Sequence, residues 1–508
     1  MRSGVAGGIR SVVRGQVALD RMPSPHPARC VPGVRNACTR ARHQETTNSA
    51  DTVGNPFQRY RIDEGVVAIR AYRRYRCWIG EDQMGSVGEP GEADTGRSEE
   101  AEVAEAVSQW FRRAWDPGLP LLEWREILVD SGWAVPSWSA EWYGRGLPPW
   151  AERVAHRTIR QAGGVATPLG VGMGLAAPTL YDHASDELMS RYLRPTITGE
   201  LTWCQLFSEP GAGSDLAGLR TTAERDGDEW VVSGQKIWNT SADHADMGLL
   251  LARTDWEAPK HTGITYFVVG MRQAGVEVRP IEQMNRHSSF NEVFLSEVRI
   301  PGDNVVGEVG GGWKVARGTL AHERSFSTQR RVTISEEASG PVVEEARAEA
   351  AEYLRTYDWY PQRMGRFDLV LERARAAESG HDPVLRQEIM QLVGLHRAAE
   401  WTAGRAKAAR TLGRPPGSEG SIGKLALSEV ARRCNHIHGV ISGPRAMLTD
   451  GSDPSDSIVA EVLVSTPAQS IAGGTDEIQR NILGENILGL PKEPAVDRGV
   501  PFRQVGPK

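Results

Sequence analysis

The sequence has few cysteines and no long uninterrupted apolar run. Its five cysteines among 508 residues are scattered and lack metal-ligand spacing, which argues against a disulfide framework and fits a reducing compartment. No apolar stretch approaches the roughly 18 residues that span a bilayer. The net charge of −6 argues against a general nucleic-acid binder, because phosphate backbones are held by clustered Lys and Arg. We expect a cytoplasmic protein with no membrane segment and no nucleic-acid partner.

The N-terminal residues 1–97 differ in composition from the rest. They are rich in Arg, Pro and Gly, contain no Lys and show no sustained period of 2 or 3.6, which predicts a largely disordered extension. One interpretation is a non-functional extension from a wrongly assigned start, with Met84 as a candidate true start. The other is a targeting peptide, which the lack of an apolar or cleavage segment disfavours.

Three further regions are expected, because a chain of 508 residues exceeds one ordinary core. Residues 98–200 are predicted to be helical, and Glu99–Ala114 places Val103, Val107, Trp110 and Phe111 on one stripe. Residues 201–307 are predicted to form a small β domain with Gly- and Asp-rich turns. Its strands are expected at Glu229–Gly234, Met247–Ala252, Gly263–Val269, Val276–Pro280 and Glu292–Leu295.

Residues 308–493 are predicted to be helical again, and residues 494–508 to form a tail. Arg414-Pro415-Pro416-Gly417 is a clear break between two of the helices. The strongest helices are expected at Ala321–Ile334, Val342–Tyr357, Pro383–Thr411 and Ile422–His438.

Two motifs in the β region carry the first chemical signal. Cys204-Gln205-Leu206-Phe207-Ser208-Glu209-Pro210-Gly211-Ala212-Gly213-Ser214-Asp215 is predicted to be a loop with glycines and hydroxyls, which can bring backbone N–H groups close to a polar ring or a phosphate. Trp238-Asn239-Thr240 can cover one face of a flat cofactor and donate to its edge. Taken singly, each has an ordinary alternative: Gly-Ala-Gly-Ser is often a turn, and a strand Trp is usually in the core.

Together these motifs resemble the acyl-CoA dehydrogenase family, which carries a Thr/Ser-Glu-Pro-x-x-Gly-Ser-Asp loop followed by a Trp-x-Thr/Ser strand. A third match is Val298-Arg299-Ile300-Pro301, with Asn304 and Gly307 after it. A fourth is Gly473-Gly474-Thr475-Asp476-Glu477 near the C-terminus. Four motifs in the family order make the signal strong. The resemblance covers about Ser98 to Glu493.

The resemblance implies an α+β fold with a helical N-terminal domain, a central β-barrel domain and a C-terminal domain like a four-helix bundle. It implies FAD as cofactor and an oligomer, either homo- or hetero-oligomeric, that completes the cofactor site. The reaction it implies is α,β-dehydrogenation of an acyl-CoA thioester, with electrons passed to an electron-transfer flavoprotein. The FAD-binding residues carried over by position are Phe207, Ser208, Gly213, Ser214, Trp238, Thr240, Thr475 and Glu477.

The catalytic base does not stand where many family members have it. Their Glu directly precedes the C-terminal Gly-Thr, where this chain has Gly473. Some relatives instead carry the base on a helix, directly before an Arg, and Glu323-Arg324 occupies that place. The resemblance therefore implies that Glu323 removes the α proton while hydride leaves for flavin N5. It also implies that Ser214, Arg324 and the Gly473 N–H bind substrate.

The local sequence is compatible with a base at Glu323. On a helix, Glu323 shares a face with Ala316, Thr319, Leu320 and Phe326. A carboxylate on that uncharged surface is expected to be partly desolvated, which raises its pKa. The alternative is a solvated helix Glu paired with a nearby Arg.

Other features depart from the family pattern. An Arg-Phe-Gly segment that binds FAD across the subunit interface cannot be placed; Arg363-Met364-Gly365-Arg366-Phe367 stands there. A Gln-x-x-Gly-Gly segment is also missing, with His436-Ile437-His438-Gly439 in that region. We interpret His436 and His438 as structural, and we expect no metal.

Three interpretations of the activity stay open. The first is a catalytic dehydrogenase, which Glu323 favours. The second is a non-catalytic subunit of a hetero-oligomer, which Gly473 and the missing Arg-Phe-Gly segment favour. The third is an oxidase or monooxygenase that uses oxygen. A nicotinamide enzyme is disfavoured because no Gly-x-Gly-x-x-Gly unit follows a strand. A serine hydrolase is disfavoured because Ser214 lacks the Gly-x-Ser-x-Gly elbow.

Overall fold

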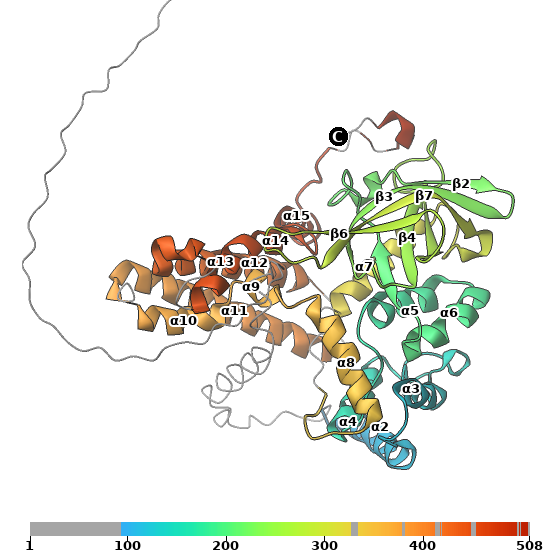
Figure 1. Ribbon diagram of the computed structural model, residues 1–508, viewed down its shortest axis with the longest axis horizontal. Coiled ribbons are helices and arrows are strands. Elements are labelled where there is room, and N and C mark those ends of the chain that lie inside the picture. The colour runs from blue at the N-terminus through green and yellow to red at the C-terminus, as the bar shows by residue number, and fades with distance from the viewer. Residues whose placement is uncertain are drawn as a thin grey trace, which may run out of the picture. The chain divides into compact units, whose positions relative to one another are not determined.

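The computed structural model shows a helical region, a β-sheet and a second helical region along the chain (Figure 1). The residues it describes are 93–326, 334–377, 381–411, 417, 419–448, 454–494, 497 and 499–505. The predicted extension thus lies outside the described residues up to 92, and helix α2 already begins at Ala93. No described helix is long and apolar enough to cross a bilayer.

The first helical region packs around a cluster of aromatic rings. Val107 and Phe111 are buried on the predicted stripe of α2. Trp124 is also buried, with its ring edge-on to Phe111 at 5.8 Å and to Trp115 at 4.6 Å. The helices are α2 (Ala93–Ala114), α3 (Leu121–Asp130), α4 (Trp150–Gln161), the π-helix η3 (Gly172–Ala176), α5 (Ala177–His183) and α6 (Asp186–Thr198).

The β domain is one seven-stranded sheet with the order β1-β4-β2-β3-β7-β6, and β5 pairs with β4. The strands are β1 (Trp203–Leu206), β2 (Thr222–Asp226), β3 (Glu229–Thr240), β4 (Met247–Arg253), β5 (Ile264–Gly270), β6 (Val276–Ile281) and β7 (Phe290–Pro301). The sheet curls, because the end of β3 returns to the end of β1. The Asn239 side-chain amide donates to the Gln205 carbonyl at 2.7 Å, and the Ile237 N–H donates to the Ser208 carbonyl at 2.9 Å.

All five predicted strands are present, but the sequence pattern missed two others. Strand β1 takes in residues that were interpreted as loop, and β2 carries charged residues on its exposed half. Both are short, and β1 pairs with β4, which is distant in sequence, whereas β2 is joined to β3 by the turn at Gly227–Asp228. Strand β1 lies parallel to β4, and β2 lies antiparallel to β3. A short strand is specified by its neighbours in the sheet more than by its own composition.

The second helical region begins with α7 (Gly312–Phe326), which packs against α5 and β5 through buried Val315, Ala316 and Thr319. Helix α7 starts earlier than the predicted helix at Ala321; residues 327–333 lie outside the described residues, and Ile334 is not helical. The remaining helices are α8 (Pro341–Arg355), α9 (Tyr360–Arg363), α10 (Phe367–Ala376), α11 (Pro383–Thr411), α12 (Glu419–Ser442), α13 (Pro454–Ser465), α14 (Pro467–Ile471) and α15 (Asp476–Asn486). The predicted break lies between α11 and α12, outside the described residues except for Gly417.

Candidate functional site

The glycine-rich loop, residues 207–219, leaves the end of β1. The loop residues that were predicted to bind FAD differ in their exposure to solvent. Gly213 and Ser214 are exposed, Ser208 is half-buried, and Phe207 is buried with its ring edge-on to Tyr266 at 5.7 Å. A Cβ added at Gly213 would meet no atom within 4 Å. The loop therefore offers Gly213 and Ser214 to a ligand, whereas Phe207 is buried and its carbonyl accepts from Lys236.

A buried ion pair holds this loop. The Glu209 carboxylate accepts from the N–H groups of Arg220 and Thr221 at 2.6 and 2.9 Å and from Lys236 Nζ at 2.8 Å. Lys236 is fully buried and also donates to the Phe207 carbonyl. Burial alone would raise the pKa of Glu209, but Lys236 and the N–H donors outweigh it, so the pKa lies below its ordinary value. Sequence reasoning assigned no role to either residue, because their pairing depends on the curl of the sheet.

Trp238 is 55% exposed and sits at a β-bulge, where the register of β3 against β7 shifts between Lys236 and Asn239. Its φ is 64°, a conformation that is rare for a bulky side chain. The ring meets Phe290 edge-on at 5.9 Å. Bulges beside functional sites re-aim side chains. The alternative interpretation of Trp238 as a core residue is therefore wrong. Half-buried Thr240 lies opposite Phe290 in the ladder.

Two buried polar atoms beside these motifs have no hydrogen-bond partner: Gln205 Nε2 on β1 and Asn239 Oδ1 on β3. A buried polar atom without a partner costs about 1–3 kcal/mol, so it calls for an explanation such as an absent ligand. The two residues are neighbours, since the Asn239 amide donates to the Gln205 carbonyl. These features suit a ligand with a flat ring system and polar edges. The exposed indole of Trp238 can stack on the ring, and the open glycine loop and the two unpaired polar atoms can approach its polar groups.

Helix α7 carries Glu323 and Arg324 on different faces. Glu323 follows Ala316 by seven residues and Thr319 by four, so it continues the face that packs against α5 and β5. Thr319 anchors that face, because its Oγ1 bonds Thr179 Oγ1 at 3.0 Å and Tyr266 Oη at 3.1 Å. Glu323 itself is half-buried. Phe326, which was predicted to share this face, ends α7, and its side chain lies outside the description.

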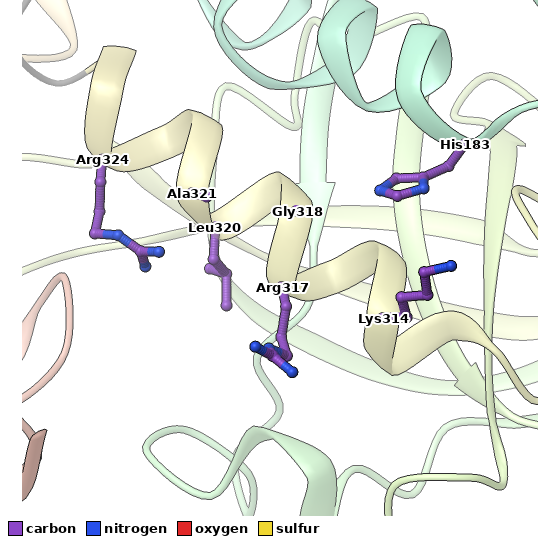
Figure 2. A pocket seen from close by; sticks show the side chains of 7 residues that line it. All are labelled: His183, Lys314, Arg317, Gly318, Leu320, Ala321 and Arg324. Atoms are coloured by element: carbon purple, nitrogen blue, oxygen red, sulfur yellow. The ribbon is translucent and has the colours of Figure 1, made fainter. Parts of the chain in front are cut away.

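The other face of α7 lines a pocket of about 520 Å³. Figure 2 shows Arg317 and Arg324 extending from the same side of the helix, with Lys314 near its start and His183 facing it from α5. The remaining lining residues are Gly318, Leu320 and Ala321, so none of the described residues that line the pocket is acidic. Burial lowers the pKa of His183. The pocket is therefore a cationic site suited to an anionic ligand, and it includes Arg324 but not Glu323.

The predicted ligand-binding residues near the C-terminus, Gly473, Thr475 and Glu477, lie at the start of α15. Gly473 and Gly474 have φ of 70° and 82°, and the Thr475 hydroxyl caps the helix by accepting from the Ile478 N–H at 3.2 Å. Glu477 is exposed. A Cβ at Gly473 would meet no atom within 4 Å, so the backbone angle, not crowding, favours glycine there.

Asp476, between these candidates, is a structural anchor that sequence reasoning did not assign. Its carboxylate is 4% exposed and bonds Lys424 Nζ at 3.0 Å and Arg432 at 2.7 Å, both on α12. Burial opposes ionisation, but Arg432, Ser428 and Lys424 hold the pKa of Asp476 well below its ordinary range.

A chain of ring contacts connects the Trp238 side of the site to the segment before Gly473. Phe290, which touches Trp238, meets Trp359 edge-on at 6.1 Å. The Trp359 indole donates to Ser289 at 3.2 Å, and the Arg363 guanidinium lies 5.9 Å from the Trp359 ring. Arg363 in turn donates to the Gln469 side chain on α14 at 2.9 Å. The stretch that replaces the expected Arg-Phe-Gly segment thus links the strands to the C-terminal helices within this chain.

His438 fills a structural role. It is buried, accepts from the Arg373 guanidinium at 2.9 Å and donates to the Arg366 carbonyl at 3.2 Å. These contacts require the neutral ring, and burial with the neighbouring Arg373 lowers its pKa to about 4. Both ring nitrogens are occupied by protein groups, as expected for a structural histidine.

Comparison with known proteins identifies relatives for the described regions. The N-terminal, middle and C-terminal domains of acyl-CoA dehydrogenases match residues 97–200, 204–298 and 363–488. The chain is 33% identical over 380 residues to the acyl-CoA dehydrogenase IpdE1 of Mycobacterium tuberculosis, covering 73% of this chain and 88% of that protein. It is 35% identical over 398 residues to FadE34 of the same organism, covering 77% of this chain but only 48% of FadE34.

A solved structure has the same fold. The ChsE4–ChsE5 complex from Mycobacterium tuberculosis matches with a TM-score of 0.53 and 25% sequence identity, over 80% of this chain and 100% of that one. The order of helices, curled sheet and helices is shared with it.

Proposed function

Because this chain belongs to the acyl-CoA dehydrogenase family, we propose that it is a catalytic member, which removes hydrogen from the α and β carbons of an acyl-CoA thioester. The observation that carries the proposal is the arrangement of α7. One face places the half-buried carboxylate of Glu323 beside Ala316 and Thr319, and the next face lines a cationic pocket through Arg317 and Arg324. One helix thus offers a base and an anion site side by side.

The cationic pocket suits the coenzyme A part of the substrate. Coenzyme A carries phosphates, and three cationic side chains line the pocket: Lys314, Arg317 and Arg324. Burial lowers the pKa of His183, so its ring is neutral near pH 7 and can serve as a hydrogen-bonding group there. Arginine forks bind phosphate oxygens in pairs. We infer that Arg324, with Ser214 from the glycine-rich loop, holds the substrate so that its thioester lies near Glu323.

FAD is the cofactor of this family in general, and the residues present fit it. The exposed indole of Trp238 and the hydroxyl of Thr240 would lie against the ring system, with Gln205 and Asn239 available for its polar edges. Ser208, Gly213 and the Thr475–Glu477 turn would hold the rest of the molecule. When bound, the flavin supplies the acceptor for the hydride that leaves the β carbon.

The protein side of the reaction is proton removal and charge stabilisation. Glu323 takes the α proton, and the Gly473 N–H donates to the thioester carbonyl, where negative charge develops. The positive φ of Gly473 sets the direction of that N–H. We further propose that the electrons leave to an electron-transfer flavoprotein.

The second candidate function is a non-catalytic subunit in a hetero-oligomer, because Gly473 carries no carboxylate at the position many relatives use. The ChsE4–ChsE5 structure is a complex of two different chains. In that case the purified chain would need a partner to bind flavin.

The deciding experiment is the anaerobic visible spectrum of the purified protein before and after addition of acyl-CoA thioesters. We expect flavin bands that bleach with substrate in the wild type. Glu323→Gln should keep the bands but lose bleaching by a factor of at least 10³, while Glu344→Gln, on the exposed start of α8, should bleach normally. Normal bleaching by Glu323→Gln would overturn the assignment of the base. A protein that stays colourless with added FAD would favour the non-catalytic subunit.

A further inference from the structure

The C-terminal segment, with described residues 497 and 499–505, returns to the β domain (Figure 1). Phe502 is 1% exposed, and its N–H donates to the Ala258 carbonyl at 3.0 Å. The next residue, Arg503, donates its N–H to the Trp256 carbonyl at 2.9 Å. The sequence pattern had predicted only a tail here. The segment is instead docked by backbone hydrogen bonds and one buried aromatic ring.

The ring of Phe502 covers a buried arginine. The guanidinium carbon of Arg253 lies 3.5 Å from the centre of that ring, and Arg253 is fully buried. Its N–H groups donate to the carbonyls of Ala217 at 2.8 Å and Leu219 at 3.2 Å, and a third contact reaches the carbonyl of Lys260 at 3.2 Å. Ala217 and Leu219 are the last part of the glycine-rich loop. A buried cation needs such partners, because its desolvation is costly.

A second connection joins the same segment to the same loop. Lys260 Nζ bonds Asp215 at 2.7 Å and Asp497 at 2.9 Å. Asp215 directly follows Ser214, and Lys260 is 8% exposed. A third contact, from the Arg220 guanidinium to the Val505 carbonyl at 3.2 Å, lies just past the loop. The C-terminal segment thus contacts or braces the chain at residues 215, 217, 219 and 220.

We propose that the C-terminal segment is a clasp that positions the glycine-rich loop for its ligand, with Phe502 and Asp497 as its two positioning residues. Fixing a backbone residue costs about 1–2 kcal/mol in entropy. A loop that is already ordered in the free protein avoids this loss when the ligand binds. Gly213 and Ser214 are exposed, and a Cβ added at Gly213 would meet none of the described atoms within 4 Å. The clasp supplies that order from outside the loop.

The ligand part of this inference rests on the proposed function, whereas the loop-ordering part does not. Amide hydrogen exchange of residues 208–220 in the cofactor-free protein tests the loop-ordering part. Titration with FAD tests the ligand part, because it measures the affinity for the cofactor. The variants are Phe502→Ala, Phe502→Leu, which keeps apolar volume without the ring, and Asp497→Asn. Arg503→Ala is the matched control, because among the described residues its side chain pairs with Glu257 at an exposed position.

We expect Phe502→Ala to speed exchange in residues 208–220 by at least tenfold and to weaken FAD binding about tenfold, with a raised KM and a smaller change in kcat. Phe502→Leu and Asp497→Asn should lie between the wild type and this variant. Truncation after Pro494 should behave like Phe502→Ala, and a synthetic peptide of residues 495–508 should restore protection in trans. A peptide with Ala at the Phe502 position should not.

Unchanged exchange in both Phe502→Ala and the truncated protein would overturn the clasp. The same holds if Arg503→Ala has an equal effect, or if exchange speeds up uniformly across the chain, since either result marks general destabilisation. Faster loop exchange in Phe502→Ala, found together with a wild-type protein that binds no FAD, would instead keep the clasp and remove the proposed function.

Discussion

Two loops of this protein are proposed to meet the same cofactor, and they are anchored in different ways. The glycine-rich loop is held by Lys236 of β3 and Arg253 of β4, which donate to its backbone carbonyls, and by its own Glu209, which accepts from the Arg220 N–H. Phe502 of the C-terminal segment covers Arg253. In the turn at Gly473–Glu477, the buried Asp476 carboxylate bonds Lys424 and Arg432 of α12, and the Gln479 side chain donates to the Gly473 carbonyl. Each loop places a buried carboxylate beside its ligand-facing residues. The glycine-rich loop is anchored mainly through its backbone carbonyls, and the Gly473–Glu477 turn mainly through the Asp476 side chain. Different substitutions should therefore loosen each of them.

The largest effect is expected when the cation beneath the glycine-rich loop is removed. Lys236→Met leaves Glu209 buried without its charge partner, which should lower the free energy of unfolding by about 3–5 kcal/mol. Thermal unfolding followed by circular dichroism measures the change. Arg299→Met, at an exposed pair with Asp226 and Glu229, is the control and should shift stability by less than ~1 kcal/mol. Equal shifts in the two variants would show that the buried pair is not an anchor.

The second effect is acid sensitivity of the helical region that carries the Gly473 turn. The pKa of His438 falls to about 4 in the folded protein, against an ordinary value of about 6.5. Between these values the unfolded chain binds a proton that the folded protein does not, so stability falls on acidification by up to ~1.4 kcal/mol per pH unit. Glu209 has a lowered pKa, so its contribution persists through this window and is lost only below it.

Urea unfolding between pH 4.5 and 7 tests this difference. We expect His438→Asn, which keeps a hydrogen-bonding group but cannot titrate, to reduce the dependence of unfolding free energy on pH. An identical slope in wild type and variant would contradict the assignment of His438 as the titrating group.

The third effect concerns the Asp476 anchor of the Gly473 turn. Asp476→Asn removes a charged partner from Lys424 and Arg432 and should cost about 2 kcal/mol. Because both cations that Asp476 bonds lie on α12, the loss should be local. Hydrogen exchange of residues 478–486 is expected to speed up while that of residues 208–220 stays unchanged. Glu477→Gln, at an exposed neighbour, is the control in the free protein. Faster exchange in both loops would mean that the two anchors are coupled.

The smallest effect compares two backbone positions with nearly the same positive φ. Trp238 has φ 64° and Gly473 has φ 70°. Gly473→Ala should cost about 1 kcal/mol from backbone strain alone, since its Cβ meets open space. Trp238→Gly relieves strain while losing ring contacts, so the melting temperature should change little although FAD affinity falls. A large loss of stability in Trp238→Gly would mark Trp238 as a packing residue.

Local pattern predicted much of the fold. Helix α11 spans the predicted Pro383–Thr411, because a proline fits the first turn of a helix and the Pro-Pro-Gly that follows cannot continue it. The five strands with alternating or apolar patterns were also found. Strands β1 and β2 were missed, since their pairing with β4 and β3 decides them.

The sequence predicted which residues belong to the candidate site, but not which other residues hold them in place. The motifs located Ser208, Gly213 and Trp238, and the structure joins their elements through the hydrogen bond between Ile237 and Ser208. The roles of Glu209 and Asp476 were not predicted, although both stand inside the motifs. Their partners Lys236, Lys424 and Arg432 lie on other elements, and a motif does not state which cation a carboxylate meets.

The sequence by itself determined the order of helices and strands, the family and the identity of the candidate residues, because periodicity, turn residues and motifs are local properties of the chain. Only the tertiary structure decided that Arg324 lines a pocket with His183, that a bulge exposes Trp238, and that Phe502 closes over Arg253. Those outcomes depend on contacts between residues distant along the chain. Burial and charge pairing, which select such contacts, exist only once the chain is folded.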